Sequence, residues 1–242
     1  IDEHNVSVQF DVTKCKNCTL CRRACADTQS VLDYYYLPST GDMPICVHCG
    51  QCASACPFGA IVEKNDVDEV RAAIQDPDKI VIFQTAPAVR VGLGESFGMD
   101  PGAFVEGKMV AALRALGADY VFDTDFGADM TIMEEAMELL HRLQSEEVPI
   151  PQFTSCCPAW VEFLETYYPD FIPHLSSTKS PISIFSPIIK TWFAKKKNID
   201  PKNIVVVDVA PCTAKKAEIK RPEMNASAAF WNIPELRDTD IS

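Results

Sequence analysis

TSCCPAW, residues 154–160, sets two cysteines side by side, Cys156 and Cys157. A disulfide between adjacent cysteines departs from relaxed disulfide geometry, so we expect two thiols with separate roles. The run 149–153 before them has the pattern of a strand, and an apolar helical pattern follows them. Because α/β proteins place their chemistry at the carboxyl ends of strands, this position predicts a functional site.

The chain after residue 79 alternates apolar runs with amphipathic stretches. Such alternation predicts βαβ units and an α/β domain with a mainly parallel sheet. Strands are expected at 79–85, 119–122, 152–154 and 203–209, and helices at 102–116, 129–143, 159–168 and 181–197. Cys212 follows the last of these strands, in a place equivalent to that of Cys157. We therefore expect the Cys157 and Cys212 thiolates to reach one buried metal cluster.

The first quarter of the chain contains one cysteine pattern twice. The two runs are Cys15-x2-Cys18-x2-Cys21-x3-Cys25 and Cys46-x2-Cys49-x2-Cys52-x3-Cys56-Pro57. This spacing is typical of bacterial ferredoxins with two clusters, in which the fourth cysteine of each run ligates the other cluster. The spacing therefore predicts two four-iron clusters, one on Cys15, Cys18, Cys21 and Cys56, and one on Cys46, Cys49, Cys52 and Cys25.

Zinc is the alternative metal for these runs, because Cys-x2-Cys pairs also bind zinc. A zinc site does not need third and fourth cysteines at these offsets, so iron–sulfur clusters are the favoured interpretation.

Three segments follow from these patterns. We expect an α+β ferredoxin-like domain with two clusters at 1–65, a linker at 66–78 and the α/β domain at 79–242. The irregular insert 31–42, which contains three consecutive tyrosines, is expected to pack over the clusters.

Composition narrows the class of protein. The 242 residues include 11 cysteines and carry a net charge of −12. Iron–sulfur ligation implies a reducing compartment, so we expect a cytoplasmic protein of an anaerobic microbe, with the periplasm as the alternative. The negative charge argues against nucleic acid and anionic membranes as partners. No apolar run reaches the ~18 residues that a membrane span requires.

The two cysteine loops resemble the first two signature loops of FeFe-hydrogenases, enzymes that interconvert H2 with protons and electrons. The resemblance rests on TSCCPAW at 154–160 and APCTAKKAE at 210–218, behind the two ferredoxin-type runs. It extends to TDFGAD at 124–129 and SSTKSP at 176–181, and so over nearly the whole chain. It implies that residues 79–242 form the first portion of a hydrogenase catalytic domain.

The resemblance also implies an active-site cofactor, a four-iron cluster bridged by a cysteine to a di-iron centre with CO, cyanide and a dithiolate bridge. By position, Cys157 and Cys212 are two ligands of the four-iron cluster, and Cys156 is the proton-relay thiol. A thiol suits proton relay because its ordinary pKa lies near neutral. Lys215 resembles the lysine that binds a cyanide, an anion that a compact ammonium fits. The segment 85–87 matches the loop near the other cyanide.

An onward proton path maps by the same resemblance onto Glu135, Ser176, Glu138 and Arg142. The two glutamates and Arg142 share one helix face, because they are three and seven residues apart. The opposite face is apolar and consists of Ile132, Ala136, Leu139, Leu140 and Leu143. Spacing alone predicts a solvated charged face with an ion pair between Glu138 and Arg142, whereas the resemblance favours the proton path.

Two features depart from the family pattern. Ala210 stands where many members have a methionine that packs against the di-iron centre. The third cysteine loop is missing, so Cys157 and Cys212 supply two of the four thiolates that the active-site cluster needs. We expect this chain to be inactive alone, and the other two cysteines to come from a C-terminal segment or a second subunit. Glu218 is kept in the pattern and fits a structural ion pair as well as a catalytic role.

The sequence therefore favours an FeFe-hydrogenase that reversibly reduces protons to H2, with electrons relayed through the two ferredoxin-type clusters to the active site. The implied partners are protons, H2, a ferredoxin or other redox protein as electron donor, and the maturation proteins that build the cofactor. A sensory hydrogenase is a variant of this interpretation.

Two alternatives belong to other classes. One is a hydrogenase-like iron–sulfur assembly or scaffold protein without H2 activity, which needs neither the Cys156 relay nor the Lys215 partner. The other is a ferredoxin fused to an α/β domain, which leaves Cys156, Cys157 and Cys212 unexplained.

Overall fold

The structure is a computed structural model that describes residues 5–31, 45–145 and 148–242. Two compact units are present, each assembled from segments distant in sequence. Unit 1 comprises 1–65, 142–176 and 212–218, and unit 2 comprises 66–141, 177–211 and 219–242. The domain limits expected at 65 and 78 stay a prediction. Most of the insert 31–42, with its tyrosines, lies outside the described residues.

Unit 2 is built on a parallel sheet of three strands in the order β4-β3-β5. Its strands are β3 (Ile80–Thr85), β4 (Tyr120–Asp123) and β5 (Ile204–Val209). β3 lies in the middle, and five of its six residues are buried. Strands covered on both faces are continuously apolar, which is why IVIFQT and IVVVDV show little alternation. The predicted parallel sheet is confirmed.

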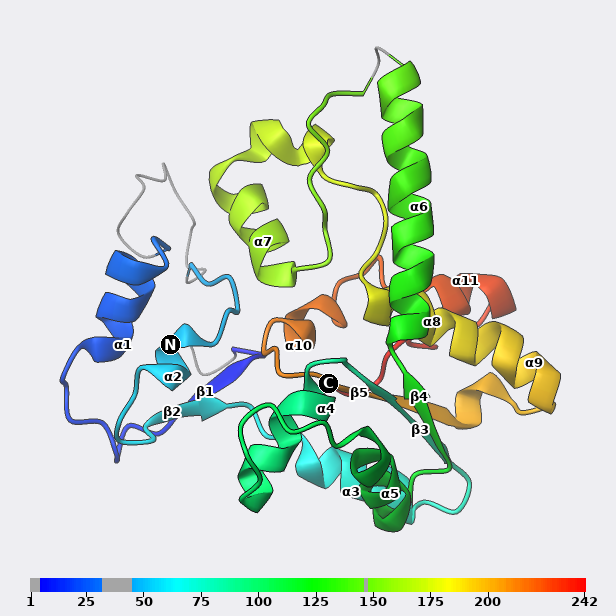
Figure 1. The fold of residues 1–242 in the computed structure, drawn as a ribbon, viewed down its shortest axis with the longest axis horizontal. Helices are drawn as coiled ribbons and strands as arrows, with labels where there is room; N and C mark the ends of the chain where they lie inside the picture. Colours follow the sequence, from blue (N-terminus) through cyan, green and yellow to red (C-terminus); the bar gives the residue numbers. More distant parts are fainter. Residues whose placement is uncertain (1–4, 32–44, 146–147) are drawn as a thin grey trace. The chain divides into compact units, whose positions relative to one another are not determined.

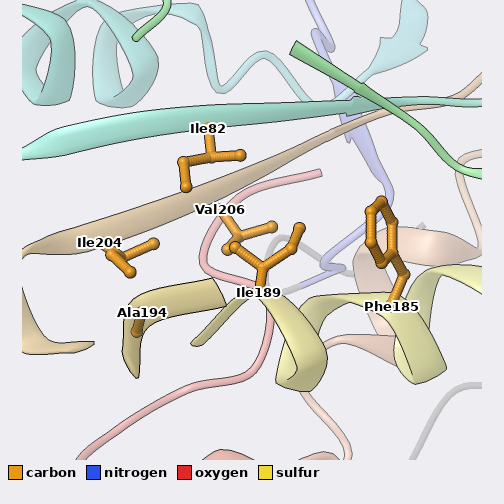
Figure 2. Packing of buried hydrophobic residues seen from close by; sticks show 6 residues of the cluster. All are labelled: Ile82, Phe185, Ile189, Ala194, Ile204 and Val206. Atoms are coloured by element: carbon orange, nitrogen blue, oxygen red, sulfur yellow. The ribbon is translucent and has the colours of Figure 1, made fainter. Parts of the chain in front are cut away.

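Helices cover both faces of this sheet (Figure 1). One face is covered by α8 (Pro181–Ile188), a π-helical turn (Ile189–Phe193) and α9 (Ala194–Lys197). Figure 2 shows the resulting core, formed by Ile82, Ile204, Val206, Phe185, Ile189 and Ala194. The other face packs against α3 (Val67–Gln75) and α5 (Glu106–Leu116).

The remaining elements are short, apart from α6 and α7. In unit 2 they are α4 (Val89–Gly92), α11 (Ala226–Trp231) and the 3-10 turns Leu93–Phe97 and Pro201–Asn203.

In unit 1, β1 (Val8–Phe10) and β2 (Ile61–Glu63) form an antiparallel pair. The helical elements of unit 1 are α1 (Leu20–Arg23), a π-helical turn (Ala24–Thr28), α2 (Gln51–Ser54), α7 (Pro158–Tyr167), a 3-10 turn (Pro169–His174) and α10 (Lys215–Glu218). The ferredoxin-like arrangement stays a prediction.

No helix in the described ranges is long and apolar enough to cross a membrane.

The strand expected at 149–153 is wrong. Phe153 forms one isolated parallel bridge with Leu175, and no ladder extends from it within the described residues. Pro149 and Pro151 have no N–H, so they cannot donate to a neighbouring strand. The TSCCPAW loop therefore follows a single bridge rather than a strand of the main sheet.

The long helix α6 (Asp125–Gln144) exposes its apolar side chains. The exposed fractions are 65% for Ile132, 67% for Met133, 64% for Met137, 51% for Leu140 and 61% for Leu143. By contrast, Thr131 and Arg142 on the polar face are only 5% and 4% exposed. The expectation of a solvated charged face is therefore wrong at Arg142. The pattern of apolar residues correctly predicted a helix but misidentified its buried side.

We expect alanine substitutions at two glycines to change the free energy of unfolding in opposite directions, one through helix propensity and the other through tight packing. A Cβ on Gly127 of α6 meets the Pro181 carbonyl oxygen and lies 2.9 Å from the Phe185 Cβ, whereas nothing lies within 4 Å of one on Gly107 of α5. Gly107→Ala should raise the free energy of unfolding by up to about 1 kcal/mol. Gly127→Ala should lower it by about 1–3 kcal/mol, because the added methyl overpacks the contact with α8. Urea unfolding measures both, and equal stabilisation by the two substitutions would contradict this packing.

Candidate metal centre

The TSCCPAW loop ends as the start of α7. Cys157 is the N-cap of this ten-residue helix, and Pro158 occupies its first turn. Backbone N–H groups in the first turn have no acceptor within the helix, so the N–H that proline lacks is not needed there. The Cys156 and Cys157 side chains are both exposed. Cys157 therefore lies at the N-terminal end of α7 with its side chain accessible, and its role as a cluster ligand stays a prediction.

Aromatic and backbone contacts fix the approach to this loop. The Phe153 ring meets the Trp160 ring edge-on, with centroids 5.9 Å apart. The Phe153 N–H donates to the His174 carbonyl at 2.8 Å, and the Ser176 N–H donates to the Phe153 carbonyl at 2.7 Å. Ser176, one of the expected proton-path residues, is 6% exposed and thus lies beside the residue that precedes the loop.

The second cysteine loop meets the first through Lys215. Cys212 follows β5, and Lys215 comes three residues later, at the start of α10. The Lys215 ammonium donates to the Cys156 carbonyl at 3.0 Å and to a Glu218 carboxylate oxygen at 2.5 Å. The Lys215 and Glu218 residues are 8% and 5% exposed, so this ion pair is buried. The Lys215 ammonium thus connects the TSCCPAW loop with the loop that contains Cys212.

Four thiols of the ferredoxin-type runs influence one another electrostatically. Burial, followed by the negative charges of Cys46, Cys49 and Cys25, raises the pKa of the Cys52 thiol to about 11. A charge on one of these groups is felt by Cys52 only if the thiols lie close together. These are the same four cysteines that the spacing assigns to the second cluster. Their proximity fits a site in which one iron core binds all four thiolates.

Cys46 is also supported by N–H donors. Asn5 donates its amide to the Cys46 sulfur at 3.4 Å, and the His48 N–H donates to it at 3.4 Å. Burial favours the neutral thiol, but hydrogen bonds from the side chain and backbone of His48 and from Asn5 lower the pKa of Cys46 overall. Such N–H donors stabilise a thiolate ligand and tune the potential of a bound cluster.

The cysteines assigned to the other cluster, three of the first run and Cys56 of the second, have similar features. Backbone N–H groups, that of Ile61 foremost and then that of Phe58, lower the pKa of Cys56. The Asn17 N–H donates to the Cys15 sulfur at 3.4 Å. No group of three or more Cys, His, Asp or Glu side chains in the described ranges is arranged to hold a single metal ion. The two predicted cluster ligand sets therefore stay predictions, supported by the chemistry of the thiols.

Ser177 is a partner of Glu138 that the sequence did not single out. The Glu138 carboxylate accepts from the Ser177 N–H at 3.0 Å and from its hydroxyl at 3.3 Å. Glu135, one turn earlier on α6, is half-buried. The SSTKSP run contained the signal, because either of its adjacent serines can donate to a carboxylate. Both glutamates and Ser177 belong to unit 2.

Arg142 has a structural task that the sequence did not reveal. Its guanidinium donates to the carbonyls of Pro149 and Pro173, both at 2.9 Å, and to that of Leu175 at 2.7 Å. All four residues lie in unit 1. Because two of these acceptors belong to prolines, whose segments cannot form a regular ladder, Arg142 replaces sheet pairing with side-chain hydrogen bonds.

Two family models match the chain. The model described as "Iron only hydrogenase large subunit, C-terminal domain" matches residues 79–242, and the "4Fe-4S binding domain" matches residues 42–62. The second match covers the run that begins at Cys46, so this part of the chain is similar to 4Fe-4S binding domains.

Hydrogenases are prominent among similar proteins. The "NADP-reducing hydrogenase subunit HndD" of Solidesulfovibrio fructosivorans is 44% identical over 92% of this chain and 41% of its own length. "Iron hydrogenase 1" of Clostridium pasteurianum is 43% identical over 99% of this chain and 42% of its own length. The chain therefore spans about two-fifths of the length of these relatives.

A solved structure and a more distant relative complete the comparison. A variant of apo [FeFe]-hydrogenase HydA1 from Chlamydomonas reinhardtii aligns with a TM-score of 0.67 and 45% identity, over 74% of this chain and 45% of that one. "Cytosolic iron-sulfur assembly component 3" of Bos taurus is 29% identical over 81% of this chain and 42% of its own length.

The Lys215–Glu218 pair gives a stability prediction. Lys215→Met removes the ammonium facing a buried carboxylate and should lower the free energy of unfolding by about 3–5 kcal/mol. The double variant Lys215→Met/Glu218→Gln buries no charge at this pair and should lose less. Chemical denaturation of both variants and of the unsubstituted chain measures the difference, with the exposed Lys220→Met as the control. A double variant less stable than the single one would show that the pair is not coupled.

Proposed function

The chain belongs to the iron-only hydrogenase large-subunit family, and on that premise we propose that it is the electron-input and first catalytic portion of an FeFe-hydrogenase. The proposed reaction is the reversible reduction of protons to H2. One observation carries the proposal: Lys215 binds the Cys156 carbonyl, so the two family loops meet in the unit that also contains the ferredoxin-type runs.

The proposed cofactors are two 4Fe-4S clusters on the ferredoxin-type runs and an active-site 4Fe-4S cluster bridged to a di-iron centre. When bound, these groups supply one-electron redox chemistry and the site at which protons and H2 interconvert. Cys157 and Cys212 provide two of the four thiolates of the active-site cluster. The other two come from polypeptide outside residues 1–242, in keeping with relatives more than twice as long.

Cys156 and Lys215 have distinct tasks in this proposal. The exposed Cys156 thiol holds and passes on the proton, because a thiol exchanges protons near neutral pH. An ammonium has three donors, and Lys215 uses two of them on the Cys156 carbonyl and Glu218. Its third N–H suits a small anionic ligand such as cyanide, and the two existing bonds fix its direction.

The proposed proton route continues through Glu135, Ser176 and Glu138. The Glu138 carboxylate is oriented by Ser177, and Ser176 is held by its backbone bond to Phe153. Arg142 contributes by positioning the loops that its guanidinium clamps.

A redox protein of the ferredoxin type is the proposed electron donor, and the cytoplasm is the proposed compartment. Maturation proteins are proposed to build the di-iron centre. An iron–sulfur assembly role is the second candidate, favoured by the 29% identity to an assembly component. The thiol of Cys156 separates the two functions, because an assembly protein requires no proton relay.

We expect Cys156→Ala to abolish turnover while leaving the cofactor in place. In anaerobically matured, full-length protein, H2 evolution should fall by at least about 100-fold, the usual contribution of a positioned proton-transfer group. Infrared bands of CO and cyanide and the iron content should stay unchanged, and the neighbouring Ser155→Ala variant serves as control. Absence of those bands and of H2 evolution in the unsubstituted protein would favour the assembly role instead.

A further inference from the structure

Thr213 connects the second active-site loop with the second ferredoxin-type run. Its hydroxyl donates to the His48 carbonyl at 2.8 Å, although the two residues are 165 positions apart. Thr213 directly follows Cys212, and His48 directly precedes Cys49. All four residues belong to unit 1. One hydrogen bond thus joins the peptides beside two proposed ligands of different clusters.

Gly50 allows this contact to form. Its φ of +75° lies in the left-handed region that favours glycine. A Cβ at this position lies only 2.5 Å from the Thr213 hydroxyl oxygen and 3.1 Å from its methyl carbon. Any larger residue therefore pushes Thr213 away from the run. Two independent features, the hydrogen bond and the missing side chain, bring these backbones together.

We propose that Thr213 is the positioning residue for electron transfer between the cluster on Cys46, Cys49, Cys52 and Cys25 and the cluster on Cys157 and Cys212. This inference rests on the proposed function. A continuous path leads from the Cys49 sulfur along the backbone to the His48 carbonyl. It crosses the 2.8 Å hydrogen bond to Thr213 and follows the backbone to the Cys212 sulfur. Every step is a covalent bond except that one.

The transfer is balanced in electrons. One electron leaves the cluster on the second run, which is oxidised by one electron, and the cluster on Cys157 and Cys212 is reduced by one. A low-potential one-electron donor, such as a reduced ferredoxin-type protein, then returns the cluster on the second run to its reduced state. Thr213 gains or loses no proton, and none of its covalent bonds changes.

Three variants test this assignment in anaerobically matured, full-length holoprotein. Thr213→Val keeps the shape and removes the donor, Thr213→Ser keeps the donor, and Gly50→Ala forces the loops apart. Iron content and the electron paramagnetic resonance of each reduced cluster verify loading. Flash photoreduction with freeze-quench sampling then measures the rate at which the electron passes between the two clusters.

We expect Thr213→Val and Gly50→Ala to load their clusters and slow this rate several-fold, while Thr213→Ser restores the unsubstituted rate. An unchanged rate in Thr213→Val overturns the inference and leaves the proposed function intact. Equal slowing by Thr213→Ser, or loss of a cluster from Thr213→Val, shows a merely structural role and also overturns it. Absence of a cluster on Cys157 and Cys212 in the unsubstituted protein contradicts the proposed function itself.

Discussion

The burial of closely spaced cysteine thiols is the constraint on which the first part of the chain depends. The pKa of Cys52 rises to about 11 because the group is buried beside Cys46, Cys49 and Cys25. Neither α1 nor α2 contains a buried residue, and the apolar packing of this segment comes from residues such as Val8, Val47 and Ile61. A bound iron core would favour the thiolates over the neutral thiols, and its binding energy would then add to the folding energy of this segment. In the proposed function, the cysteine runs are therefore both the electron relay and the framework of their own segment.

The active-site loops are held by charge and hydrogen bonds rather than by a sheet. The chain leaves the apolar core of unit 2 at the end of β5 and enters unit 1 at Cys212. There, Lys215 binds the first loop, and Thr213 binds the second ferredoxin-type run. Directional contacts of this kind fix side chains in position, which suits the proposed transfer of electrons and protons with little rearrangement.

Much of the fold was predictable because its signals are local. IVIFQT and IVVVDV are rich in β-branched residues and are buried on both faces, so they indicate parallel strands without any structure. The predicted cluster ligands also rest on local signals: the offsets within each cysteine run, the repetition of the run, and Pro57 after the last cysteine. The strand expected at 149–153 failed because two prolines remove its donors, a local signal that deserved more weight than the apolar pattern.

Other features depend on contacts between distant residues. A helical pattern shows that α6 has two faces but not which face is buried, and the structure exposes Ile132 and Met133 while burying Arg142. The three carbonyl acceptors of Arg142, the Ser177 partner of Glu138 and the Thr213 contact with His48 join segments that no periodicity relates. Gly50 is an intermediate case, because a glycine after Cys49 is visible in the sequence but its neighbour is not.

Metal analysis combined with Mössbauer spectroscopy of anaerobically prepared protein tests the central claim most directly, that the cysteine runs bind iron–sulfur clusters. The account predicts about eight irons per chain in the two runs, all in four-iron clusters, and further iron wherever the active-site cluster is loaded. Replacement of Cys25 or Cys52 by serine should remove or destabilise one of the two relay clusters and spare the other. Stoichiometric zinc without iron in the unsubstituted protein would contradict the account.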